Sequence, residues 1–329
     1  MADDRTPIVP PDADNISAAA RRLRQGGLVA FPTETVYGLG ADATNDKAVA
    51  AVFQAKDRPR FNPLIVHVGD ANAARSVVGF NPAAETLAEA FWPGALTIVL
   101  PRLDDRIALL VSAGLDTIAV RVPNHPVAQA LLAEAGVPVA APSANKAGCI
   151  SPTAAGHVVF SLPGPGNGGP DMILDGGPCP VGVESTVIDL TGSSPVLLRP
   201  GGVAAEDIEA VVGPVSSLAE ADPGEPQGAP HKSPGLMTRH YAPNLPLRLD
   251  AEKPKPGEGF LAFGPGAPED AMNLSPTGDL EEAAANLFAM MRALDGPPFE
   301  AIAVMAVPNR GLGRAINDRL RRAVGPADG

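Results

Sequence analysis

The sequence is short of cysteine and of positive charge, and each shortage excludes a class of protein. Two cysteines among 329 residues, Cys149 and Cys179, are too few for a disulfide framework or a four-ligand structural zinc site. Lysine and arginine number 25 against 37 acidic residues, so the net charge of −12 repels a nucleic-acid backbone. We therefore expect no structural zinc, and any contact with RNA must use a local basic patch.

Long apolar runs are missing as well. The most apolar stretch, residues 91–101, is interrupted by Pro93 and Gly94 and falls short of the roughly 18 residues that a membrane-spanning helix needs. Residues 1–15 are acidic and rich in proline, unlike a secretory signal or a basic transit peptide. We expect a cytoplasmic protein without a membrane span.

The sequence does contain an alternation of strand and helix patterns. Apolar runs typical of buried strands occur at 28–31, 64–68, 96–100, 117–122, 137–142, 186–190 and 196–199. Helical patterns lie at 15–24, 46–56, 83–91 and 127–135, with Asn15 and Asp46 as the expected N-caps of the first two. This alternation predicts an α/β domain over residues 1–212.

A change of composition separates a second unit. Residues 213–244 are rich in proline, glycine and alanine and lack apolar periodicity, which predicts a linker. Its last part, SPGLMTRHYAP (233–243), concentrates binding-type side chains such as Tyr241, which suggests a segment that closes over a site. Residues 245–329 show strand, helix, strand and helix patterns in turn, which predicts a small α/β domain.

Several familiar functional motifs are either absent or lack the sequence context that they require. No lysine follows a glycine, so the P-loop is absent, and no G-x-S-x-G elbow occurs. A literal G-x-G-x-x-G starts at Gly164, but surrounding prolines and the lack of a following helix make it a surface loop. The five histidines show no metal-ligand spacing.

Polar and charged residues instead gather where apolar segments end. PTETVYGLGAD (32–42) predicts a threonine-rich and glycine-rich turn between a strand and a helix. Lys56, Arg58 and Arg60 follow one another closely, which fits either an anion site or solvated surface charge.

Two further residues lie inside strand patterns. Position alone makes His67 more often a hydrogen-bonded core histidine than a ligand. Arg121 interrupts a buried strand pattern and needs a carboxylate partner, from the protein or from a ligand.

The loops after later strands repeat this pattern. Ser143, Asn145 and Ser151 follow an apolar strand, where they suit phosphate or ribose contact, although turn chemistry explains them equally well. Ser185 precedes another strand, and Arg199 ends the next one.

Taken together, these segments resemble a known family. The motifs are PTETVYGLGAD, K-D-R at 56–58, S-A-N at 143–145, SPT at 151–153, VESTVID, LRPGG and SPGLMTRHYAP. In this order they resemble the YrdC-like L-threonylcarbamoyladenylate synthases, in the form with an extra C-terminal domain. The resemblance is close over residues 26–243, and Ala147 departs from it, since relatives often carry serine there. It implies a twisted, open, mixed sheet with helices and a smaller Rossmann-like C-terminal α/β domain.

The resemblance also implies a reaction. L-threonine, bicarbonate or CO₂, and ATP with Mg²⁺ would give threonylcarbamoyl-AMP and pyrophosphate, a nucleotidyl transfer that serves threonylcarbamoyladenosine formation next to the anticodon of tRNA. The expected partner is the tRNA threonylcarbamoyl-transfer complex that uses the product. The sequence leaves the oligomeric state open, with a monomer favoured over an oligomer. Such chemistry needs anions to be positioned and neutralised rather than a covalent nucleophile.

The family pattern assigns roles to residues of this sequence. Lys56, Arg58, Ser143 and Asn145 would be catalytic. The ATP site would comprise Lys56, Arg58, Asn62, Thr117, Ser143, Asn145, Ser151, Arg199 and Tyr241. The threonine site would comprise Thr35, His67, Arg121, Ala141 and Ser185, and metal would be held mainly through phosphates rather than by protein ligands.

Other readings remain open. A carbamoyl-adenylating hydrogenase-maturation protein contains a similar domain, but it needs cysteine-rich zinc motifs that two cysteines cannot supply. An RNA-binding module, or a sensor of threonine or nucleotide without turnover, would share the domain but would form no product.

Overall fold

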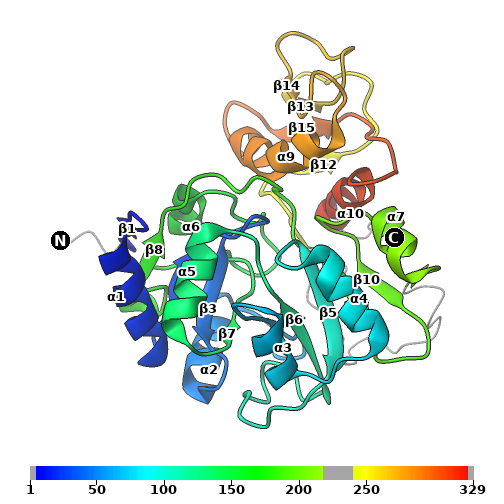
Figure 1. Ribbon diagram of the computed structural model, residues 1–329. Helices are drawn as coiled ribbons and strands as arrows, with labels where there is room; N and C mark the ends of the chain where they lie inside the picture. The colour runs from blue at the N-terminus through cyan, green and yellow to red at the C-terminus, as the bar shows by residue number, and fades with distance from the viewer. Residues whose placement is uncertain (1–4, 218–239, 325–329) are drawn as a thin grey trace.

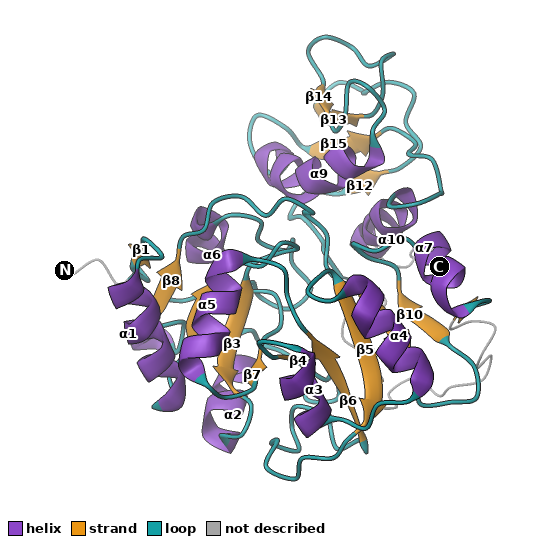
Figure 2. Cartoon of the chain, in the orientation of Figure 1, coloured by secondary structure: helices purple, strands orange, loops and turns teal. Residues whose placement is uncertain are grey.

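Two β-sheets organise the computed structural model, which describes residues 5–217 and 240–324 (Figures 1 and 2). The larger sheet has eleven strands in the order β1-β8-β2-β3-β7-β4-β6-β5-β9-β10-β11 and mixes parallel with antiparallel pairs. The smaller sheet has four parallel strands in the order β12-β15-β13-β14. The predicted α/β class, with a mixed sheet and a smaller α/β unit, is confirmed.

The elements have the following bounds. The strands are β1 (Ile8–Val9), β2 (Val29–Phe31), β3 (Gly38–Asp42), β4 (Ile65–His67), β5 (Leu96–Pro101), β6 (Thr117–Arg121), β7 (Val139–Ala140), β8 (Met172–Leu174), β9 (Thr186–Asp189), β10 (Val196–Arg199), β11 (Ser216–Ser217), β12 (Leu247–Arg248), β13 (Glu258–Ala262), β14 (Met272–Asn273) and β15 (Ala301–Val304). The helices are α1 (Ala13–Arg24), α2 (Asp46–Ala55), α3 (Ala71–Val77), α4 (Pro82–Phe91), α5 (Pro126–Ala135), α6 (Ala155–Ser161), the 3₁₀ turn η1 (Pro165–Asn167), α7 (Ala205–Val212), α9 (Leu280–Leu294) and α10 (Gly313–Val324).

The observed N-caps of the first two helices lie three residues and one residue before the expected ones. The Asp12 carboxylate accepts the N–H of Asn15 at 2.9 Å, so Asn15 lies inside α1 and was the wrong choice of cap. Likewise, Asn45 rather than Asp46 caps α2 by accepting two backbone N–H groups. In both helices the cap is the residue with extended backbone, as an N-cap requires.

Strand β3 lies where the sequence predicted a turn. Residues 38–42 were predicted to be part of a turn, but they form a completely buried strand in the middle of the large sheet. A Cβ on Gly40 would lie 2.8 Å from Cε1 of Phe31, so the glycine is needed for the close packing of β3 against β2. Of residues 32–42, only those before Gly38 lie outside strands, as the predicted turn requires.

The middle of the large sheet brings the candidate residues together. Strands β4 and β6 run parallel with His67 opposite Arg121, so both side chains leave the sheet at the same edge. Strand β7 runs antiparallel to β4, so the residues after it lie beside the start of β4, where the N–H of Ala141 donates to the carbonyl of Ile65 at 3.0 Å. Segments from distant parts of the chain therefore meet beside these short middle strands.

The smaller unit packs directly against the larger one. One apolar cluster combines Val36, Ile150 and Val183 of the large unit with side chains of α9 and α10. Figure 1 shows α10, in red, beside α7 and between the small sheet and the large unit. The contact surface between the two units thus lies next to the short middle strands of the large sheet.

The predicted linker is only partly described. Residues 218–239 lie outside the described residues, and so does the part of SPGLMTRHYAP before His240. The described beginning belongs to the large sheet, because β11 pairs with β10. At the other end, the N–H of His240 donates to Arg322 O and that of Ala242 to Gly148 O, so both units hold this segment.

Among the described helices, none has the length and apolar character needed to cross a membrane.

Candidate active site

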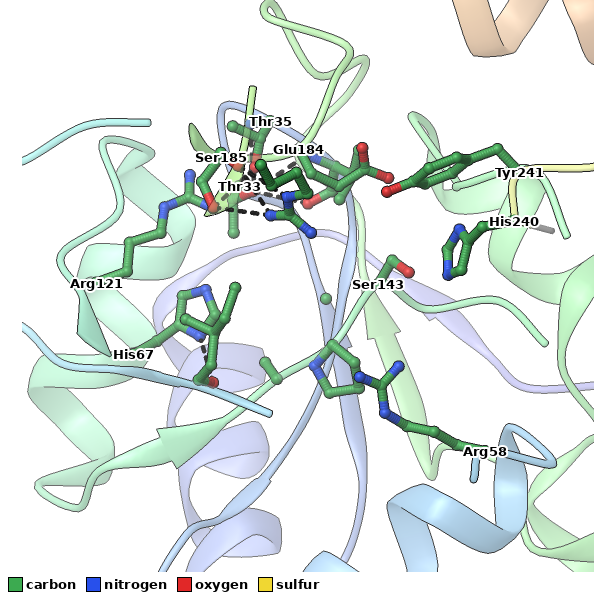
Figure 3. Close-up of a pocket in the computed structure, with 16 residues that line it drawn as sticks. Thr33, Thr35, Arg58, His67, Arg121, Ser143, Glu184, Ser185, His240 and Tyr241 are labelled. Atoms are coloured by element: carbon green, nitrogen blue, oxygen red, sulfur yellow. Dashed lines mark hydrogen bonds between the residues drawn. The ribbon is translucent and has the colours of Figure 1, made fainter. Parts of the chain in front are cut away.

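A cavity of about 50 Å³ lies beside the middle strands of the large sheet (Figure 3). Its lining includes nine of the predicted site residues: Thr35, Arg58, His67, Arg121, Ala141, Ser143, Ser185, Arg199 and Tyr241. The other five do not line it: Lys56, Asn62, Thr117, Asn145 and Ser151. Figure 3 shows His67 and Arg121 on one side and His240 and Tyr241 on the other.

Arg121 is held by two residues of the segment after β2. Its guanidinium donates to Oε1 of Glu34 at 2.6 Å and to Oγ1 of Thr35 at 2.9 Å, and it is only 3 % exposed. The required carboxylate partner is therefore Glu34, which the sequence analysis did not single out. Thr35 in turn lies 2.8 Å from the Thr33 hydroxyl, so this side of the cavity is a fixed network of hydroxyls and one arginine.

His67 is both a core residue and a lining residue. Its Nδ1 lies 3.2 Å from the carbonyl of Ile65, and its ring meets Phe31 edge-on. Burial and the neighbouring charge of Arg121 lower the pKa of His67 to about 3, so the imidazole is neutral at pH 7. The two readings left open for it are thus compatible.

The three cations at 56–60 have three different environments. The Lys56 ammonium is buried and donates to Ser143 O at 2.5 Å and also to Asn145 O, so it fixes the S-A-N loop from behind. Arg58 is buried, lines the cavity, and donates to Asn62 O at 3.1 Å and Pro63 O at 2.7 Å. Arg60 is exposed.

Arg199 and Glu184 fix the segment before β9, another part of the cavity lining. The Arg199 guanidinium donates to Ser185 O at 2.8 Å and to the Ser185 hydroxyl at 3.2 Å. One oxygen of Glu184 accepts a short hydrogen bond from Ser151, and the other accepts from Arg319 at 2.9 Å. Ser151 therefore acts on the cavity through Glu184, the one acidic residue in its lining.

The cavity is electrostatically prepared for an anion. Three arginines and a single carboxylate line it. Burial and then the charge of Arg199 lower the pKa of Arg58 to about 9, while burial and then Arg58 lower the pKa of Lys56. A bound phosphate would offset both the burial and the mutual repulsion of these cations.

Several buried polar atoms near the cavity have no hydrogen-bond partner. They are both amide atoms of Asn62, Oδ1 of Asn145, Nδ1 of His240 and the hydroxyl of Tyr241. Native structures leave few buried polar groups unsatisfied, and a cluster of them indicates a ligand. Asn62 and Asn145 thus keep hydrogen-bonding capacity beside the cavity although they do not line it.

The segment at His240 and Tyr241 is strained and buried. Tyr241 has a φ of +65°, a left-handed conformation that disfavours residues with a side chain and persists only where its surroundings impose it. Its ring stacks on Phe288 of α9, and the two rings of the segment lie 4.0 Å apart. His240 and Glu184 line the cavity without having been predicted as site residues. Both lie in motifs already noted, His240 in SPGLMTRHYAP and Glu184 in VESTVID.

Among the described residues, no group of three or more histidine, cysteine, aspartate or glutamate side chains is arranged to hold a metal ion.

Comparison with known proteins agrees with this arrangement over the length of the chain. A family model described as "Telomere recombination", for Sua5, YciO and YrdC proteins, matches residues 21–201. A second, described as "Threonylcarbamoyl-AMP synthase, C-terminal domain", matches residues 203–325.

Individual relatives and a solved structure match nearly the whole chain. Threonylcarbamoyl-AMP synthase from Bacillus subtilis is 42 % identical over 94 % of this chain and 93 % of its own, and the Pyrococcus abyssi protein of that name is also 42 % identical, over 94 % of each chain. The crystal structure of P. abyssi Sua5 complexed with L-threonine superposes with a TM-score of 0.85 and 40 % identity, covering 97 % of this chain and 96 % of that one. With both halves matched in the expected order around this cavity, the chain belongs to the threonylcarbamoyl-AMP synthase family, in its two-domain form.

Proposed function

We propose that this protein is an L-threonylcarbamoyladenylate synthase, a nucleotidyltransferase. L-threonine, bicarbonate and ATP give threonylcarbamoyl-AMP, pyrophosphate and water. The product serves threonylcarbamoyladenosine formation next to the anticodon of tRNA, and its consumer is a threonylcarbamoyl-transfer complex. The full-length relatives of this name support the activity.

The observation that carries the proposal is that one buried cavity combines two kinds of binding group. Hydroxyls and Arg121 stand on one side and Arg58 stands on the other (Figure 3), and Arg199 also lines the cavity. An amino acid and a polyphosphate need these two kinds of group. We assign L-threonine to the wall formed by Thr35, His67, Arg121, Ala141 and Ser185, and ATP to the wall with Arg58 and Tyr241.

The chemistry follows from this division. The threonine amine captures CO₂, and a carbamate oxygen then attacks the α-phosphorus of ATP, with pyrophosphate as the leaving group. Two anions have to approach each other, so neutralisation by Arg58 and Arg199 lowers the barrier. Lys56 contributes by holding the carbonyls of Ser143 and Asn145, which fixes the loop that faces the phosphates.

Mg²⁺ belongs to the proposal as part of the substrate. Both oxygens of Glu184 already accept hydrogen bonds from Ser151 and Arg319. We propose that Mg²⁺ enters bound to the phosphates of ATP and keeps water as its remaining ligands, as this ion commonly does.

The size of the cavity supports a moving segment. Ligand pockets for molecules of drug size hold roughly 300–1,000 Å³, whereas this one holds about 50 Å³ and is bounded by His240 and Tyr241. We propose that ATP enters while the His240–Tyr241 segment is displaced and that the segment then closes over the bound nucleotide. We propose residues 1–212 as the catalytic domain, 213–244 as the linker that closes over the site, and 245–329 as the C-terminal domain.

The decisive experiment is mass spectrometry of a reaction with the purified protein, ATP, Mg²⁺, L-threonine and bicarbonate. Pyrophosphate is followed in parallel, and L-serine replaces threonine as the control. Threonylcarbamoyl-AMP, formed with threonine in step with pyrophosphate, is the expected result. If threonine or ATP binds but neither product forms, the protein is a sensor; RNA affinity that falls steeply with salt and needs no ATP would instead indicate an RNA-binding module.

A further inference from the structure

Arg319 of helix α10 belongs to the C-terminal unit, where it donates to Asp318 Oδ2 at 2.9 Å, but it makes two further contacts with the catalytic unit. Its side chain is fully buried. The guanidinium donates to Oε2 of Glu184 at 2.9 Å and to the carbonyl of Pro200 at 2.6 Å. Glu184 is 135 residues away along the chain, and Pro200 directly follows the cavity residue Arg199.

Both contacts lead to the cavity. Glu184 lines it, and its second oxygen accepts from Ser151. Arg319, Glu184 and Ser151 therefore form a chain of charge-assisted hydrogen bonds that starts in the C-terminal unit and ends at a residue of the predicted ATP site. Such a chain fixes the rotamer of the carboxylate in its middle.

Arg319 also supports the strained segment over the cavity. Its guanidinium carbon lies 5.2 Å from the centre of the Tyr241 ring, which also contacts the rings of His240 and of Phe288 in α9. The preceding residue, His240, donates its N–H to the carbonyl of Arg322, one turn further along α10. The C-terminal unit thus holds both the ring and the backbone of this segment.

Stabilisation of the fold does not account for this arrangement. A buried ion pair is often no more stabilising than apolar residues of the same volume, because both charges lose their hydration. Nη2 of Arg319 is buried and has no hydrogen-bond partner, which a purely structural arginine would avoid. The Tyr241 hydroxyl shares this property, so two orphaned polar groups lie on the same side of the cavity.

We infer that Arg319 is a positioning residue for the nucleotide, which holds Glu184 and Tyr241 in the geometry that ATP requires, so that the active site is incomplete without α10. The inference rests on the proposed function for its kinetic readout. It assigns the C-terminal unit a direct part in the catalytic cavity rather than the role of a tether.

The test compares Arg319→Met and Arg319→Lys with Arg314→Met. Arg314 lies on the same helix, is half-buried, and pairs with Glu206 at 3.2 Å, outside the cavity lining. Pyrophosphate release gives kcat and the KM of each substrate, and equilibrium dialysis with ATP gives binding without turnover. We expect Arg319→Met to lower kcat/KM for ATP about 30-fold or more, the scale of a lost charge-assisted contact, with KM for L-threonine within about twofold and partial rescue in Arg319→Lys.

A merely structural role predicts a different pattern. Melting temperature would fall, while kcat/KM for ATP, measured below that temperature, would stay at the wild-type value; this result would overturn the inference. If Arg319→Met does not fold, Arg319→Lys and Glu184→Gln carry the test. Because both residues act through one chain of hydrogen bonds, the double variant Arg319→Lys/Glu184→Gln should lose no more kcat/KM for ATP than the more harmful of the two single variants. Losses in kcat/KM that add independently would contradict the inference.

Failure of the proposed function gives its own signature. If the wild-type protein forms no threonylcarbamoyl-AMP, the enzymatic proposal fails by itself. The dialysis experiment then still decides the role of Arg319: weaker ATP binding in Arg319→Met than in Arg314→Met supports it, and equal binding refutes it.

Discussion

At the residue scale, the closely spaced cations at 56–60 show how one sequence cluster divides into different tasks. Lys56 holds the S-A-N loop, Arg58 faces the cavity, and Arg60 is exposed. Arg60 thus fits the surface-charge interpretation, whereas Arg58 lies where the anion interpretation requires it, and the anion site itself stays a prediction.

Substitution of Arg58 tests the division of the cavity. Arg58→Met removes the charge at similar length, and the loss of a hydrogen bond to a charged group is worth about 1.5–3 kcal/mol, or roughly 10-fold to 100-fold in KM for ATP. KM for L-threonine should stay within about twofold, the scale of noise in such comparisons. Steady-state pyrophosphate release measures both, with Arg60→Met as the unchanged control. Equal increases for both substrates would contradict the assignment of ATP to this wall.

The Tyr241 hydroxyl offers a single-atom test. It is buried without a protein partner, so Tyr241→Phe removes an unsatisfied group and should leave the free energy of unfolding unchanged or raise it by about 1 kcal/mol. If the hydroxyl contacts bound nucleotide, ATP dialysis should show weaker binding. Urea unfolding provides the stability, and a variant that binds ATP like the wild type would remove the hydroxyl from the site.

At the element scale, β3 shows why a glycine-rich segment can be a core strand. Gly38 and Gly40 let β3 approach the Phe31 ring of β2 closely, and the strand then places its preceding threonines at the cavity. The packing of one central strand thus controls the position of Thr35.

Gly40→Ala measures this packing. The new Cβ would lie 2.8 Å from Phe31 Cε1 and 3.0 Å from Val139 Cγ1. Overpacking of this kind costs about 1–3 kcal/mol of unfolding free energy. Gly69→Ala is the matched control, because no atom lies within 4 Å of its Cβ position. Urea unfolding of both variants should show a loss only at Gly40, and equal stabilities would refute the close-packing explanation.

At the scale of the whole molecule, buried neutral histidines make stability depend on pH. Burial, with the charge of Arg121, lowers the pKa of His67 to about 3, and burial beside several cations lowers the pKa of His240 well below its usual value. Burial also lowers the pKa of His157 to about 4. The native protein therefore excludes protons that the unfolded chain binds below about pH 6.5.

The sign of the effect follows directly. Because the unfolded state binds more protons, stability falls as the pH drops below about 6.5, by about 1.4 kcal/mol per pH unit for each fully depressed histidine. Chemical unfolding at pH 7 and pH 5 should show a loss of several kcal/mol, and His67→Gln should reduce that loss. Constant stability over this interval would contradict the neutral, buried state of these side chains.

Local patterns in the sequence determined much of this protein. The strand at 96–101 and the helix at 280–294 follow from apolar runs and periodicity, and the ordered motifs identify the family. Arg121, near the end of one predicted strand, and Ser185, directly before another, both line the cavity.

Only the tertiary structure decided which groups satisfy one another. Glu34 as the partner of Arg121, the burial of Arg58 but not Arg60, and the link from Arg319 to Glu184 have no local signal. The first of these pairs is separated by 87 residues and the last by 135. Hydrophobic periodicity reports which face of an element is buried, whereas the pairing of buried charges depends on distances between elements, which exist only once the sheet and α10 have been packed together.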